Sequence, residues 1–153
     1  MSQPVHAVVM HRFTAPADRV FDAWLDAVML GRWMFGPNVR DEQIVRLSLE
    51  PRVGGKFSFV VNRQGTEVDH VGEFLEIDRP RLLVFTWATR DTLPEMSRVI
   101  VEITPRDPGC DVKVTHLMNA QWSEYVDKAA GAWTKMLDAL ERVMVQDAAS
   151  TES

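Results

Sequence analysis

Residues 123–146 read SEYVDKAAGAWTKMLDALERVMVQ, the longest segment of this 153-residue chain with an unbroken helical period. Its apolar residues recur at intervals of three or four and therefore share one face of a helix. They are Val126, Ala129, Ala130, Trp133, Met136, Leu137, Leu140, Val143 and Met144. We predict a helix about 36 Å long over this stretch, with Ser123 as its N-cap, and its apolar face needs a broad apolar partner.

The partner that we predict is a curved sheet, because the segments before this helix show the period of two that is typical of half-buried strands. One strand is expected at residues 6–13, and six more at residues 44–49, 56–62, 66–77, 83–87, 97–104 and 112–118. The last six follow one another through short turns, which predicts an antiparallel meander. The inner face of this meander would carry Phe57, Phe59, Phe74, Phe85, Trp87, Val101 and Val114.

Two short helices are predicted between the first strand and the meander. Pro16 suits the first turn of one helix, and Asp26 can cap the other, which has to end before Gly36 and Pro37. In the strand at 66–77 the alternation breaks near residues 75–76, so we expect a bulge there that bends the sheet. The whole pattern predicts an α+β helix-grip fold, a curved seven-stranded antiparallel sheet wrapped around one long C-terminal helix.

The composition, with 46% hydrophobic and 25% charged residues, is that of an ordinary globular domain. We predict one domain at residues 6–147 and a disordered tail at 148–153. The net charge of −5 comes without any cluster of Lys and Arg, which argues against a nucleic-acid partner. The single cysteine, Cys110, excludes an internal disulfide and fits a reducing cytoplasm. No apolar run approaches a membrane span and no signal peptide is evident, so we expect a cytoplasmic protein that does not bind membranes.

Several runs of the sequence together resemble a known family. They are APADRVFDAWLD at 15–26, GRWMFGP at 31–37, VGGKFSF at 53–59, GEFLEIDRPRLLVFTW at 72–87, VTHLM at 114–118 and AWTKMLDAL at 132–140. The chain resembles, from about residue 6 to residue 145, the proteins related to the C-terminal domain of the activator of Hsp90 ATPase, within the Bet v1-like or START-like (SRPBCC) superfamily. The resemblance implies a sheet around a long helix, two short helices at one end, and an apolar cavity between. Relatives often carry Trp where this chain has Met34, which would reshape the mouth of that cavity.

The resemblance leaves three functions open, because the superfamily includes ligand carriers, cyclase-like enzymes and a cochaperone domain. Our leading hypothesis is a binding module for a small apolar or aromatic molecule. Aromatic and Met side chains would form the core and partly line the pocket. The candidate ligand-binding residues are Trp24, Trp33, Phe57, Phe59, Phe74, Phe85, Trp87, His116, Trp133 and Met136. A chaperone partner, and a monomer or homodimer, are further expectations.

His116 is the sharpest single candidate, because the strand phase turns it inward beside Val114. It could be a core imidazole, a group that orients a ligand, or a general acid/base in a cyclase or hydratase, with Glu73 or Tyr125 as a partner. His70 also faces inward, but its strand and that of His116 would lie three places apart, about 14 Å, too far for a shared metal. We predict no metal site, no cofactor and no catalytic residue.

Overall fold

The computed structural model describes residues 4–152, and the side chains of residues 4–148. The elements run in the order β1 (Val5–Phe13), α1 (Ala17–Asp22), α2 (Ala27–Trp33), β2 (Gln43–Leu49), β3 (Lys56–Arg63), β4 (Thr66–Asp78), β5 (Leu82–Thr89), η1 (Arg90–Thr92), β6 (Ser97–Pro105), β7 (Cys110–Met118), η2 (Ala120–Tyr125) and α3 (Val126–Glu152). Every predicted strand and both short helices are present. The predicted α+β helix-grip fold is confirmed.

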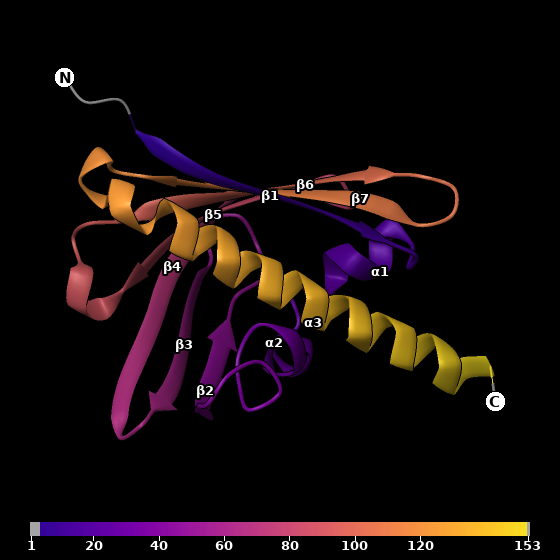
Figure 1. Ribbon diagram of the computed structural model, residues 1–153, viewed down its shortest axis with the longest axis horizontal. Coiled ribbons are helices and arrows are strands. Elements are labelled where there is room, and N and C mark those ends of the chain that lie inside the picture. The colour runs from indigo at the N-terminus through magenta and orange to yellow at the C-terminus, as the bar shows by residue number, and fades with distance from the viewer. Residues whose placement is uncertain (1–3, 153) are drawn as a thin grey trace.

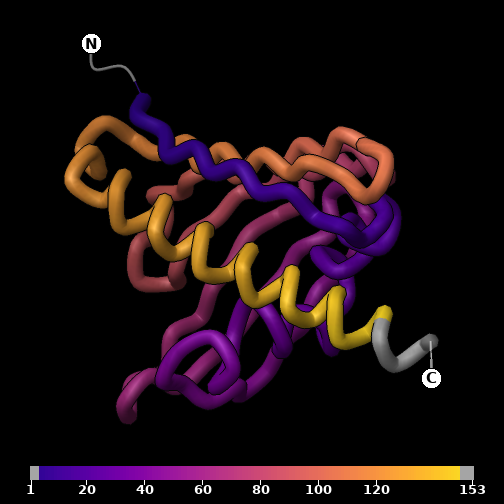
Figure 2. Tube along the Cα trace, turned by 45° about the vertical axis from the view of Figure 1, so that its right-hand side comes forward, coloured from indigo at the N-terminus to yellow at the C-terminus, as the bar shows by residue number. Residues whose placement is uncertain are grey.

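The strands form a single antiparallel sheet in the order β1-β7-β6-β5-β4-β3-β2. Strands β2 to β7 are the predicted meander, and β1 joins its far edge by pairing with β7, where Val9 lies opposite Val114. The sheet bends around α3, which crosses its concave side from one end of the domain to the other (Figures 1 and 2). This arrangement gives the apolar stripe of α3 the broad partner that it requires.

Two register shifts produce the bend. The predicted bulge in β4 is present, between Phe74 and Glu76. A second shift lies in β2 between Ile44 and Arg46, and it leaves the side chain of Val45 exposed. The sequence shows regular alternation there, so this second bulge was not predicted. A bulge adds local twist, and two of them curl the β2–β4 half of the sheet toward α3.

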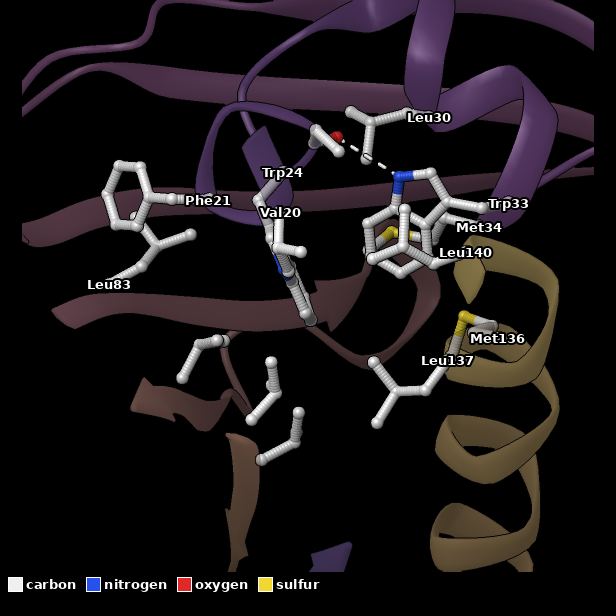
Figure 3. Close-up of a cluster of buried hydrophobic side chains, with 14 of the residues drawn as sticks. Val20, Phe21, Trp24, Leu30, Trp33, Met34, Leu83, Met136, Leu137 and Leu140 are labelled. Atoms are coloured by element: carbon white, nitrogen blue, oxygen red, sulfur yellow. Dashed lines mark hydrogen bonds between the residues drawn. The ribbon is translucent and has the colours of Figure 1, made fainter. Parts of the chain in front are cut away.

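Helices α1 and α2 cover one end of the concave face. The Asp26 carboxylate caps α2 as predicted, because it accepts hydrogen bonds from the backbone N–H groups of Val28 and Met29 at 2.9 and 3.3 Å. The indole N–H of Trp33 donates to the carbonyl of Ala23 at 3.0 Å, which ties α2 to the end of α1. Figure 3 shows Trp33 and its neighbours from these helices facing Met136, Leu137 and Leu140 of α3.

Helix α3 differs from the prediction at both ends. It begins at Val126, after the 3-10 turn η2, and Ser123 lies inside that turn rather than at an N-cap. The reason is that Asn119 accepts a hydrogen bond from the N–H of Gln121 and so starts a tighter helix earlier. At the other end α3 runs on to Glu152, so residues 148–152 are helical where a disordered tail was predicted. Ser153 lies outside the described residues.

Candidate functional site

The middle of the domain is filled rather than hollow. Nine of the ten predicted ligand-binding residues are almost fully buried, namely His116 and eight members of the hydrophobic core. The eight core members are Trp24, Trp33, Phe57, Phe59, Phe74, Phe85, Trp133 and Met136. The space enclosed among Trp24, Leu30, Met34 and the phenylalanines measures about 10 Å³, which is the room that a single water needs.

Trp24 explains why this space is closed. Its ring centroid lies 4.7 Å from that of Trp33 and 5.7 Å from that of Trp133, so the indoles of α1–α2 and α3 meet in the centre. A roomy cavity at this position was expected and is not found there. Whether any of these eight side chains contacts a ligand stays a prediction.

An open pocket of about 400 Å³ lies instead beside the first turns of α3. Strand β5, the loop from η1 to β6, the end of β7 and η2 surround it. Its apolar walls are made by Trp87, Ala88, Met96, Met118, Trp122, Tyr125, Ala129 and Ala132. Arg63, Glu95 and Lys128 supply its charged groups. A concave, mainly apolar surface of this size with a few polar groups is typical of small-molecule sites.

Only Trp87 and His116 of the predicted set line this pocket. The sequence analysis missed Met96, which is 53% exposed, and it considered Tyr125, which is 46% exposed, only as a possible catalytic partner of His116. Trp122 was not among the candidate ligand-binding residues either, but its ring lies 5.2 Å from that of Tyr125 and forms part of the pocket wall. A signal was available, since two aromatic residues occur within the polar connection at 119–125.

Both ring nitrogens of His116 are bound by protein groups. The indole N–H of Trp133 lies 3.1 Å from Nδ1, and Ser97 Oγ lies 2.7 Å from Nε2. An indole N–H can only donate, so Nδ1 is the acceptor and the neutral ring carries its proton on Nε2. Ser97 Oγ then accepts a hydrogen bond from the Nε2–H group of His116, and the Ser97 hydroxyl donates to the carbonyl of Trp87 at 2.8 Å. Burial lowers the pKa of His116 to about 4, so the ring is neutral at pH 7.

This arrangement favours the structural role among the three considered for His116. Neither nitrogen is free to take a proton from a ligand. Glu73 lines a different hollow on the outer face of the sheet, together with Lys56 and Arg90, and is therefore not a partner of His116. Tyr125 does share the pocket with His116, yet no hydrogen bond joins them among the described residues.

His70 occupies a comparable buried position in β4. Its Nδ1 lies 3.1 Å from the carbonyl of Phe59, and its ring packs against Phe35 and Trp87 at 4.9 and 5.4 Å. Burial lowers the pKa of His70 to about 4. Strands β5 and β6 separate it from β7, as predicted, so His70 and His116 lie on strands three places apart. In the described chain, no three His, Cys, Asp or Glu side chains are grouped so as to hold a metal ion.

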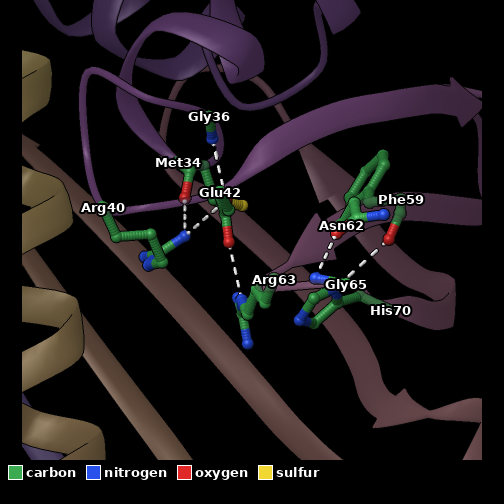
Figure 4. A network of polar contacts seen from close by, with 9 residues as sticks. All are labelled: Met34, Gly36, Arg40, Glu42, Phe59, Asn62, Arg63, Gly65 and His70. Atoms are coloured by element: carbon green, nitrogen blue, oxygen red, sulfur yellow. Dashed lines mark hydrogen bonds and ion pairs between the residues drawn. The ribbon is translucent and has the colours of Figure 1, made fainter.

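A buried carboxylate lies next to the pocket and was not predicted. The Glu42 side chain is fully buried and accepts hydrogen bonds from Arg63 Nε at 2.6 Å, the backbone N–H of Gly36 at 2.8 Å, and Arg40 Nη1 at 3.1 Å (Figure 4). Burial raises the pKa of Glu42, but these hydrogen bonds and the two guanidinium charges outweigh it, so the pKa is lowered. Glu42 is therefore ionised, and it fixes Arg63 at the edge of the pocket.

The fold and the site together define a Bet v1-like (SRPBCC) domain, the class in which a curved sheet grips a long C-terminal helix. A family model described as "Activator of Hsp90 ATPase homolog 1-like protein" matches residues 14–145. The chain belongs to this family, as the sequence resemblance indicated. No curated protein matches the sequence.

Solved bacterial structures of low sequence identity share the fold. A protein of unknown function from Staphylococcus aureus is 17% identical to this chain and superposes with a TM-score of 0.81. The match covers 99% of this chain and 98% of the Staphylococcus aureus chain. A Nitrosomonas europaea protein is 18% identical with a TM-score of 0.79, over 94% and 96%. A Chromobacterium violaceum protein is 20% identical with a TM-score of 0.76, over 91% and 96%. At these identities the likeness shows the fold alone.

Other expectations stay predictions. They are the cytoplasmic location, the chaperone partner and the monomeric or homodimeric state. No helix within residues 4–152 is both long and apolar enough to cross a membrane.

Proposed function

We propose that this protein binds a small apolar or aromatic molecule in the pocket between η2, the η1–β6 loop and the first turns of α3. The observation that carries the proposal is the combination of a concave volume of about 400 Å³ with walls of Trp, Tyr and Met side chains. Flat aromatic rings and flexible thioethers suit aromatic ligands of varied shape.

The exposure of these side chains supports the proposal. Met96 is 53% exposed and Tyr125 is 46% exposed, although each has apolar surface that burial would stabilise by about 25 cal/mol per Å². A ligand in the pocket would remove this surface from water. The core beneath needs no rearrangement for this, because the pocket lies outside the packed indoles of Trp24 and Trp133.

A pocket-filling substitution tests the proposal. Ala132 lies on α3 and lines the pocket, with its own side chain exposed, so Ala132→Phe should occupy the binding volume without entering the core. The matched control is Lys135→Phe, an exposed position on the same helix outside the pocket.

The probe is phenylnaphthylamine, a neutral apolar dye that fluoresces when removed from water. We expect it to bind the wild-type protein and the Lys135→Phe variant alike, and to bind Ala132→Phe at least tenfold more weakly. The proposal is wrong if wild-type protein does not bind the dye, or if Ala132→Phe binds it as tightly as wild type does.

A further inference from the structure

Arg63 ends β3 and presents one edge of its guanidinium group to the pocket. Its Nε donates to the buried carboxylate of Glu42 at 2.6 Å, which holds the group in place. The Arg63 side chain is 37% exposed, and among the described residues no hydrogen bond uses either of its Nη atoms. In Figure 4 the terminal nitrogen of Arg63 points away from Glu42. The group is therefore fixed on one side and open on the other.

The charges around Arg63 do not balance. Glu42 is shared between Arg63 and Arg40, so one negative charge meets two positive charges and the cluster keeps a net charge of +1. Arg40 uses its Nη1 on Glu42 and on the carbonyl of Met34 at 2.9 Å. Arg63, as the member of the cluster that lines the pocket, is the one placed to receive an additional anion.

The other charged groups of the pocket do not replace Arg63. Lys128 is exposed, and its Nζ lies 5.9 Å from the centre of the Tyr125 ring, so its charge is hydrated and lies beside an aromatic ring at the rim. Glu95 is also exposed and would repel an anion at its own side of the pocket. The anion site is therefore expected at Arg63 rather than spread over the pocket.

We propose that the ligand is a compact aromatic carboxylic acid whose ring lies on Trp87 and Trp122 and whose carboxylate accepts hydrogen bonds from the Nη groups of Arg63. This proposal rests on the proposed function and specifies its ligand class. A planar carboxylate matches the open edge of a guanidinium group, which can donate two parallel hydrogen bonds to it. Glu42 is a positioning residue in this scheme, because it acts on the ligand only through Arg63.

The test compares naphthoate with its methyl ester, which has the same ring system without the charge. Calorimetric titration of wild-type protein at pH 7 should show tighter binding of the acid. Arg63→Met should weaken naphthoate binding about tenfold and change binding of the ester by less than about twofold, because only the acid loses its charge-assisted hydrogen bonds. The control Arg46→Met removes an exposed positive charge on β2 outside the pocket, and it should keep the preference for the acid.

The outcomes separate this proposal from the proposed function. If the ester binds wild-type protein but the acid is not preferred, or if Arg46→Met weakens the acid as much as Arg63→Met does, the Arg63 proposal is wrong and the pocket still stands. If neither compound binds wild-type protein, both proposals fail. Should Arg63→Met not fold because Glu42 loses a partner, Arg63→Lys keeps the charge but not the paired donors. Its preference for the acid should fall at least threefold, and an unchanged preference would reject the proposal.

Discussion

The two ends of the concave face are rich in the same kinds of side chain, yet one is closed and the other is open. Near the middle of α3, Leu137 and Leu140 are fully buried in the same hydrophobic core as Trp33 and Leu30 of α2 (Figure 3). At the first turns of the same helix the neighbouring element is η2, where Trp122 is only half-buried. Aromatic content therefore does not tell a core from a pocket in this fold.

The difference lies in the element that covers each end. Helix α2 points Leu30 and Trp33 at α3, and the Asp26 cap and the Trp33–Ala23 hydrogen bond hold it in place. The turn η2 has a kink at Trp122, whose φ of −97° and ψ of 16° are not helical, so its side chains do not form one continuous face. A 3-10 turn packs fewer side chains against its neighbour than an α-helix does, and space remains. Trp133 and His116 form the wall between the two ends.

Truncating Trp133 in that wall should have the largest effect on the stability of the protein. Trp133 is 2% exposed, its ring lies 5.7 Å from Trp24, and it donates the hydrogen bond to His116. We expect Trp133→Ala to lower the free energy of unfolding by about 3 to 5 kcal/mol, measured by urea denaturation. Trp122→Ala, at the open end, should cost less than about 1 kcal/mol. Equal losses in the two variants would mean that both ends are packed alike.

Lowering the pH should destabilise the protein through its two buried histidines. Burial lowers the pKa of both His70 and His116 to about 4. In the unfolded chain their pKa is about 6.5, so between these values the unfolded state binds more protons. This contribution to stability is complete above pH 6.5 and is lost as the pH falls toward 4, by about 3 kcal/mol for each histidine.

Replacing each histidine singly shows how much of the loss of stability at low pH comes from each end of the concave face. Urea denaturation between pH 7 and pH 4 should show a drop in stability that is about 3 kcal/mol smaller in His116→Phe than in wild type, and similarly smaller in His70→Phe. His70 packs on Phe35 of the closed end, whereas His116 lines the pocket. If replacing His116 reduces the loss of stability at low pH less than replacing His70 does, solvent reaches His116 through the pocket. If neither replacement changes the pH dependence of stability, the burial of both rings is contradicted.

The smallest effect is expected for ligand binding at the open end. Trp122→Ala removes one wall of the pocket, so affinity for phenylnaphthylamine should fall about tenfold, which is 1.4 kcal/mol. The binding is measured by dye fluorescence. Thr134→Ala, on the exposed face of α3, serves as the control and should bind the dye as wild type does. An unchanged affinity in Trp122→Ala would place the dye elsewhere on the protein.

The sequence alone was sufficient for the architecture. The stripe of α3, the alternation of seven strands, the Asp26 cap and the bulge near residues 75–76 were all predicted and are all present. Each depends on residues close together in the chain, because helical and strand periods and caps are local properties. The same runs of residues carried the resemblance to the family, which the family match over residues 14–145 confirms.

The tertiary structure alone decided where the pocket lies and which groups face it. The hydrogen bond from Trp133 to His116 joins residues 17 positions apart, and the ion pair from Arg63 to Glu42 joins residues 21 apart. Glu42 lies in a polar stretch of the sequence that gives no sign of burial, and Trp122 has the same side chain as the buried Trp24. The pattern of a segment tells which side chains are apolar, but burial is set by what the other segments place over them, and that is a property of the packed fold.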